Sequence, residues 1–140
     1  MKPGVVELLN YLKATEGYWL GLLTGNIEKG ARIKLGVFNL NEYFPIGAFG
    51  SDDEDRDGLL PVAVKKFREM TNIDINYNNC IGVGDTPLDV QCAKIFGAIS
   101  VAVSTGPYNY ESLLQTEADD VLRDLSHAIA VVQELKGKLV

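Results

Sequence analysis

The stretch that most constrains the fold of this chain is the segment CIGVGDTPLDV, residues 80–90. An apolar run with β-branched residues leads into two glycines, and Asp85 follows where the predicted strand ends. Pro87 suits the first position of a helix. We therefore predict a buried parallel strand that brings Asp85 and, four residues later, Asp89 to the carboxyl edge of a sheet, where open α/β folds bind ligands.

The composition is that of an ordinary globular domain. The chain has 140 residues, of which 46% are hydrophobic and 23% are charged, so it can form one domain with a core. A net charge of −6 without a Lys/Arg cluster argues against nucleic acid or an anionic membrane as the main partner. Cys80 and Cys92 fit no metal-ligand pattern and are expected to be reduced thiols. No apolar run approaches the ~20 residues that span a bilayer, and no signal-peptide core is seen, so we expect a cytoplasmic location.

The single histidine, His127, limits the catalytic schemes that the chain could use. A metal site with several histidines is excluded, and no serine or cysteine lies in a nucleophile-elbow context such as GxSxG. We expect His127 to face solvent on a late helix.

Strand and helix patterns alternate along the chain. Short apolar runs bounded by turn residues predict strands at residues 18–23, 46–49, 81–83, 98–103 and 118–122. Helical spacing of apolar residues predicts helices at residues 4–14, 27–35, 60–70, 87–96, 110–115 and 125–135. This alternation predicts a single α/β domain over residues 1–140, with a mainly parallel sheet and helices on both faces.

Polar residues follow the predicted strands at one edge of this sheet. The hydroxyl of Thr24 and the free amides of Gly25 and Asn26 would form a cradle for a phosphoryl oxygen. A Thr-Gly-Asn turn with Asn26 as a helix N-cap is an equally good interpretation of these residues. Asp85 suits a Mg²⁺ ligand because hard cations prefer carboxylate oxygens. For Asp89, a second metal-ligand role and stabilisation of a helix N-terminus both remain open.

These motifs, in this order, resemble those of the haloacid dehalogenase (HAD) superfamily, and most closely its phosphoglycolate phosphatase-like branch. Residues 22–26 (LLTGN) resemble the second motif, whose Ser or Thr binds the phosphoryl group, and residues 82–89 (GVGDTPLD) resemble the fourth, which supplies a Mg²⁺ carboxylate. The resemblance runs from residue 3 along nearly the whole chain. It implies a HAD-like Rossmannoid fold, a three-layer α/β/α arrangement, and Mg²⁺-dependent hydrolysis of small phosphate esters.

The resemblance also implies roles for single residues. Thr24 would be a catalytic and substrate-binding residue, and Gly25 and Asn26 would bind substrate. Asp85 would be a metal ligand, with Asp89 as a second ligand.

The third motif of the family is a basic residue that holds the phosphoryl group and the nucleophile. Arg56 stands before a predicted helix at the spacing of the family pattern, and its planar guanidinium binds phosphate bidentately. We assign Arg56 to catalysis and substrate binding, with Lys65 as the fallback. The alternative for Arg56 is a loop cation that balances the acidic residues at 52–57.

The first motif of the family, Asp-x-Asp, is missing after any early apolar strand of this sequence. Residues 53–55 and 55–57 have the spacing, but they lie in a polar loop and follow the second motif. In the family, the first of these aspartates attacks phosphorus and the second is the general acid and base, so covalent catalysis lacks its nucleophile here. The family's first central strand and its cap are also missing. We therefore expect the C-terminal part of a longer phosphatase, with little or no turnover of its own.

The missing strand has a structural consequence. Without it, residues 19–23 and 81–83 would expose strand edges, so we predict that they pair directly or that strand exchange or a homo-oligomer covers them. The expected partner is otherwise a small phosphorylated metabolite, whose identity depends on the missing cap. The alternative function is a non-catalytic α/β module for binding or regulation.

Overall fold

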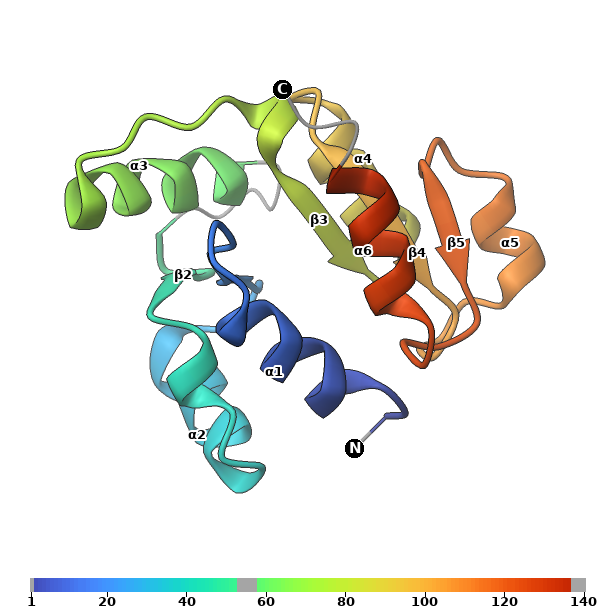
Figure 1. Cartoon of the computed structure of the whole chain (residues 1–140), viewed down its shortest axis with the longest axis horizontal. Coiled ribbons are helices and arrows are strands. Elements are labelled where there is room, and N and C mark those ends of the chain that lie inside the picture. Colours follow the sequence, from blue (N-terminus) through green and yellow to red (C-terminus); the bar gives the residue numbers. More distant parts are fainter. Residues whose placement is uncertain (1, 53–57, 137–140) are drawn as a thin grey trace. The chain divides into compact units, whose positions relative to one another are not determined.

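The computed structural model describes residues 2–52 and 58–136 (Figure 1). The chain divides into two compact units. The first unit, named the Asp85 unit, consists of Met1–Tyr11 and Asn76–Val140. The second unit, named the Thr24 unit, consists of Leu12–Ile75. Both units combine parallel strands with helices, so the predicted α/β class is confirmed. No helix in the described part of the chain is long and apolar enough to cross a membrane.

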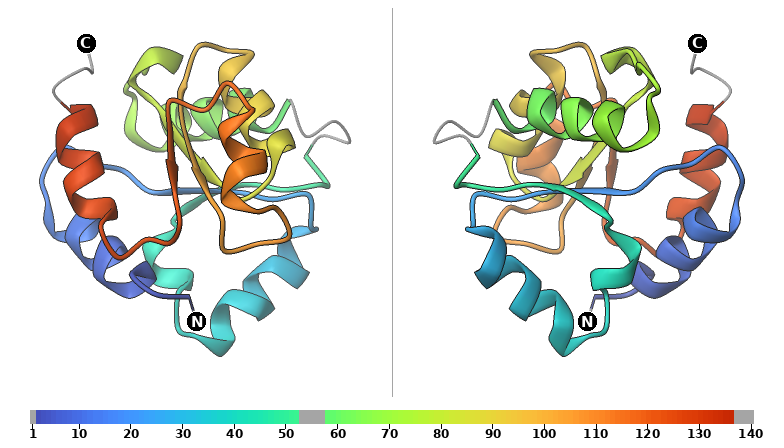
Figure 2. Two further views of the ribbon diagram at one scale, coloured as in Figure 1. Left: turned by 90° about the vertical axis from the view of Figure 1, so that its right-hand side faces the viewer. Right: turned by 90° about the vertical axis from the view of Figure 1, so that its left-hand side faces the viewer.

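The Asp85 unit contains a three-stranded parallel sheet. Its strands, in sheet order, are β3 (Ile81–Gly84), β4 (Ile99–Val103) and β5 (Asp120–Leu122). Its helices are α4 (Pro87–Lys94), α5 (Tyr110–Leu114), α6 (Ala128–Lys136) and the short 3₁₀ helix η3 (Tyr77–Asn79). Figure 2 shows α4 and α5 on one face of this sheet and α6 on the other, which is the three-layer arrangement expected for right-handed βαβ crossovers.

The core of the Asp85 unit lies between β4 and the helices α4 and α5. Val90, Ala102 and Leu113 form its buried cluster, and Ala102 and Leu113 are wholly inaccessible to solvent. β4 is the central strand of the sheet, and four of its five residues, 100–103, are buried; Ser100 is the one polar residue of this strand. α1 (Val5–Ala14) begins in this unit, where the Tyr11 hydroxyl accepts a hydrogen bond of 3.3 Å from Gln133 of α6.

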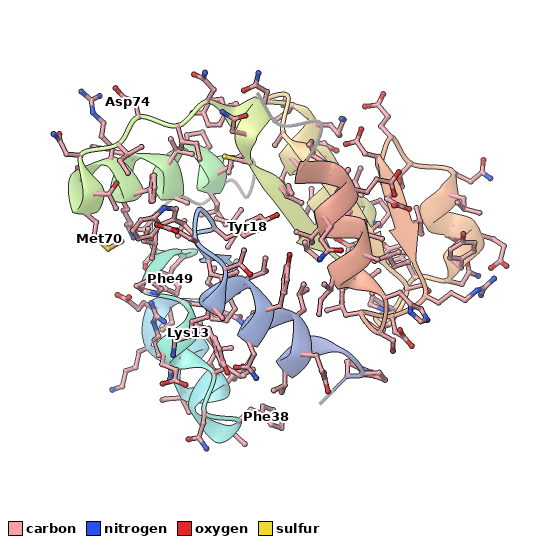
Figure 3. The ribbon with its side chains drawn as sticks, in the orientation of Figure 1. Lys13, Tyr18, Phe38, Phe49, Met70 and Asp74 are labelled. Carbon is pink, nitrogen blue, oxygen red and sulfur yellow. The ribbon has the colours of Figure 1, made fainter. Side chains whose placement is uncertain are left out.

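The Thr24 unit contains a two-stranded parallel sheet of β1 (Gly21–Leu23) and β2 (Ile46–Ala48). Its helices are α2 (Glu28–Val37), the 3₁₀ helix η1 (Asn41–Tyr43) and α3 (Leu59–Thr71). Phe49, labelled in Figure 3, and Leu59 are its most deeply buried large side chains. Trp19 stands edge-on against Phe67 of α3, with ring centroids 5.2 Å apart.

Two sequence predictions about the fold are wrong. Asn26 is not a helix N-cap, because Ile27 occupies that position before α2 and makes no side-chain cap. His127 is exposed, as predicted, but it precedes α6 rather than lying in it. Within their own units, β1 pairs with β2 and β3 pairs with β4, and the direct pairing of residues 19–23 with residues 81–83 stays a prediction. Each pair joins consecutive strands by a helical crossover, which contains α2 and η1 in the first pair and α4 in the second.

Candidate active site

The turn from β3 into α4 is fixed by a reciprocal capping box between Thr86 and Asp89. The Thr86 hydroxyl accepts from the Asp89 amide at 3.2 Å, and Asp89 Oδ2 accepts from the Thr86 amide at 3.1 Å. The same Oδ2 also accepts from the Thr86 hydroxyl at 3.0 Å and from the Asp85 amide at 3.1 Å. Pro87 at the first helical position completes the cap. The backbone of Asp85 is therefore held by the side chain of Asp89.

This geometry shows that Asp89 has the helix-stabilising role that the sequence left open. Its Oδ2 is occupied by three donors from the turn. A metal-ligand role for Asp89 stays a prediction, and it would have to use the carboxylate's other oxygen.

The Asp85 carboxylate differs from that of Asp89 because it has no hydrogen-bond or ion-pair partner among the described residues. It is half-buried at the carboxyl end of β3. It lies against Gly106, in the loop after β4: a Cβ added to Gly106 would collide with Asp85 Oδ2 and lie 2.7 Å from its Cγ. The Asp85 carboxylate can lie in this position because residue 106 is a glycine and has no side chain.

These features fit a single carboxylate ligand for Mg²⁺. An unpaired carboxylate oxygen is a preferred ligand of this ion, which usually keeps several waters and takes only one or two carboxylates from the protein. No group of three or more His, Cys, Asp or Glu side chains suited to a metal gathers among the residues that the structure describes. Asp85 would therefore hold the ion together with water and substrate oxygens.

The Thr24 turn connects β1 to α2 in the other unit. The Thr24 amide donates to the Ala48 carbonyl at 3.1 Å, and the Thr24 hydroxyl accepts from the Asn26 amide at 3.1 Å. The Asn26 amide is therefore not free, contrary to the sequence prediction. The Gly25 amide makes no hydrogen bond with a described residue, and the Thr24 hydroxyl keeps its proton available for donation.

A close contact between two loops shapes this turn. The Gly50 amide donates to the Asn26 carbonyl at 2.8 Å, and a Cβ on Gly50 would collide with the Gly25 carbonyl. The loop after β2 thus packs directly on the turn after β1, and only glycine allows this approach.

Lys66 and Asp52 hold the start of the loop after β2. Lys66 Nζ donates to Asp52 Oδ2 at 2.9 Å and to the Gly47 carbonyl at 2.7 Å, and Asp52 Oδ2 accepts from the Phe49 amide at 2.8 Å. The hydrogen bond from Lys66, and next that from the Phe49 amide, lower the pKa of Asp52 below its usual value. Lys66 also lies over the Phe49 ring, 5.4 Å from its centroid.

The predicted site residues fall into separate groups. Thr24, Gly25 and Asn26 lie together in one unit, and Asp85 and Asp89 lie together in the other. Their cooperation in one active site stays a prediction. Arg56 lies outside the described residues, and the fallback residue Lys65 is exposed on α3.

Sequence reasoning missed three contributors to these turns. The capping box had a signal, because Thr-x-x-Asp before a helix is a known signature. Gly106 and the Lys66–Asp52 pair had none, because each depends on a contact between segments 14 or more residues apart.

Comparison with known proteins supports the family resemblance. Residues 1–97 match the family model of haloacid dehalogenase-like hydrolases. The chain is 26% identical over 133 residues to a candidate pyrophosphatase, PpaX, of Caldanaerobacter subterraneus, which covers 95% of this chain and 59% of that protein. It is 30% identical over 124 residues to phosphoglycolate phosphatase of Escherichia coli, covering 86% of this chain and 46% of that protein.

A solved structure supports the fold. A haloacid dehalogenase-like family hydrolase from Streptococcus pneumoniae has a TM-score of 0.81 with 19% identity, covering 94% of this chain and 59% of that one. The chain thus spans about half the length of the relatives that it matches, between 46% and 59%. Because the family model matches more than half of its residues, this chain belongs to the haloacid dehalogenase-like hydrolase family.

Proposed function

We propose that this chain carries the metal-ligand and phosphate-binding turns of a Mg²⁺-dependent phosphatase that hydrolyses small phosphate esters, of the phosphoglycolate phosphatase type. The observation that carries this proposal is the Asp85 carboxylate, which is half-buried, unpaired among the described residues and mounted on a backbone that Asp89 fixes. The names of the two relatives, a phosphoglycolate phosphatase and a candidate pyrophosphatase, support the same chemical class.

The proposed roles follow from the demands of phosphoryl transfer, which depends mainly on positioning and on stabilising negative charge. The Thr24 hydroxyl and the Gly25 amide donate to phosphoryl oxygens, and the Arg56 guanidinium balances their charge. Mg²⁺, when bound, supplies further charge neutralisation at the phosphoryl group. Asp85 holds the ion through its carboxylate. The sequence contains no Asp-x-Asp after an early strand, so we propose that the 140 residues alone turn over little or no substrate.

Calorimetric titration of the chain with Mg²⁺ and inorganic phosphate tests the binding roles. We expect binding that Asp85→Asn weakens and that Asp74→Asn leaves unchanged. Asp74 is a matched control because, among the described residues, its exposed carboxylate pairs only with the exposed Arg68, at 3.3 Å. A well-folded chain without affinity for either ion would instead favour the non-catalytic α/β module, which the missing nucleophile motif makes the second candidate.

The strand edges of the Thr24 unit support a proposal about the partner of this chain. The Thr24 amide donates to the Ala48 carbonyl, so the backbone polar groups of Ala48 face β1. Because successive residues of a strand alternate in direction, the backbone polar groups of Gly47 and Phe49 face the outer edge of β2. Lys66 donates a hydrogen bond to the Gly47 carbonyl, and Asp52 accepts one from the Phe49 amide. Because these backbone groups are already bonded, a further strand cannot pair with that edge of β2. No such closure is described for the far edge of β1, where Leu23 is 42% exposed. We propose that a second copy of the chain pairs or exchanges a strand there.

We also propose a cytoplasmic location, which is supported by two cysteines, Cys80 and Cys92, that are not joined in a disulfide.

A further inference from the structure

We infer that Gly106 is a positioning residue for Asp85: by having no side chain, it sets where the Asp85 carboxylate lies. The part of this inference that concerns Mg²⁺ rests on the proposed function. The part that concerns the position of the carboxylate rests on the geometry of the Asp85 unit alone.

The contact between the two residues is unusually close. A Cβ on Gly106 would collide with Asp85 Oδ2, lie 2.7 Å from its Cγ and lie 3.0 Å from its Cβ. The φ of Gly106 is not positive, so this dihedral angle does not require a glycine there. The cost of a methyl group at this position therefore comes from Asp85.

The loop that carries Gly106 cannot easily retreat. At its start, the Ser104 amide donates to the Leu122 carbonyl of β5 at 2.9 Å. At its end, Asn109 caps α5 by accepting from the Ser112 amide at 2.8 Å. Pro107 follows Gly106 directly and restricts the backbone between these two anchors.

The backbone of Asp85 cannot easily retreat either. Its amide is bonded to Asp89 Oδ2, and its residue follows directly on β3, which pairs with β4. With both backbones held, the side chain of Asp85 is the part that can move. A methyl group at position 106 should therefore rotate the carboxylate away from its present place.

A double-mutant cycle in urea tests the contact without any metal. We expect Gly106→Ala to lower the urea midpoint, and we expect at least half of that loss to disappear in an Asp85→Ala background, where Oδ2 and Cγ are gone. Gly82→Ala is the matched control: its new methyl group would lie 3.1 Å from the Ala93 side chain in the same unit, so its loss should be equal in both backgrounds. An equal loss from Gly106→Ala in both backgrounds would overturn the inference.

Titration with Mg²⁺ tests the consequence for the site. Because misplacing the supports of a metal ligand typically costs 10–100-fold in affinity, we expect Gly106→Ala to weaken binding by about tenfold or more. Gly82→Ala should bind Mg²⁺ as the wild type does, because its new methyl group would meet the Ala93 side chain and not Asp85. Equal affinity of the Gly106→Ala and wild-type chains would also overturn the inference. If the wild-type chain binds no Mg²⁺, the proposed function fails, and the urea cycle still decides whether Gly106 positions Asp85.

Discussion

Asp89→Ala should destabilise the chain far more than the loss of a half-exposed carboxylate ordinarily does. The substitution removes three hydrogen bonds that Oδ2 accepts, two from backbone amides and one from the Thr86 hydroxyl. Loss of a helix cap costs roughly 0.5–2 kcal/mol, and hydrogen bonds to a charged acceptor contribute about 1.5–3 kcal/mol. Because the three bonds share one oxygen and are not additive, we expect a total loss of about 2–3 kcal/mol in the free energy of unfolding.

Urea unfolding followed by circular dichroism measures this loss, with linear extrapolation to water. Asp89→Asn keeps one acceptor oxygen but loses the negative charge that strengthens its hydrogen bonds. We expect this substitution to lower the free energy of unfolding by about 1 kcal/mol. Asp74→Ala removes an exposed carboxylate whose ion pair is on the surface, and it should stay within ~0.5 kcal/mol of the wild type. An Asp89→Ala chain as stable as the Asp74→Ala control would refute the capping account of Asp89. If that chain also lost Mg²⁺ binding, Asp89 would be a direct metal ligand.

Further predictions concern the core and the strand edges. Leu113→Ala should cost about 2–5 kcal/mol in urea unfolding, because this side chain is fully buried in the core of the Asp85 unit; a loss below ~1 kcal/mol would contradict the packing. Asp52→Asn should lower stability at pH 7, since the depressed pKa of Asp52 stabilises the fold above the unfolded-state pKa and this contribution is lost as the pH falls through the folded-state pKa. The stabilities of the two chains should thus converge once the pH has fallen below the folded-state pKa of Asp52, and a constant difference would count against the Lys66 pair. Light scattering should show a dimer that Leu23→Lys converts to a monomer, and a wild-type monomer would exclude pairing at β1.

Much of the fold could be predicted because the chain alternates short apolar runs with helical spacing. β3, β4 and α4 lie where the sequence placed them, since glycine and proline mark their ends. The start of α2 could not be predicted, because Asn26 is a good N-cap by type but its amide bonds back to Thr24. The Asn26 carbonyl in turn accepts from the amide of Gly50, which lies in the loop after β2 and is distant from Asn26 in the sequence.

The candidate site shows the same division between local and distant contacts. Asp85 and Asp89 belong to the eleven consecutive residues 80–90, so the sequence was enough to single them out, although not to decide the role of Asp89 in the cap with Thr86. The fit of Gly106 against Asp85 joins the ends of two neighbouring strands, and no local pattern encodes it. Predicting it requires the register of β3 against β4.

Hydrolysis of p-nitrophenyl phosphate by a completed protein tests the central claim most directly. The completed protein is this chain preceded by an apolar strand that ends in Asp-x-Asp-x-Thr, assayed with Mg²⁺. We expect turnover that the 140 residues alone lack, and we expect Asp85→Asn to abolish it while Asp74→Asn leaves it unchanged. A well-folded completed protein without turnover, or one whose turnover survives Asp85→Asn, would contradict the account.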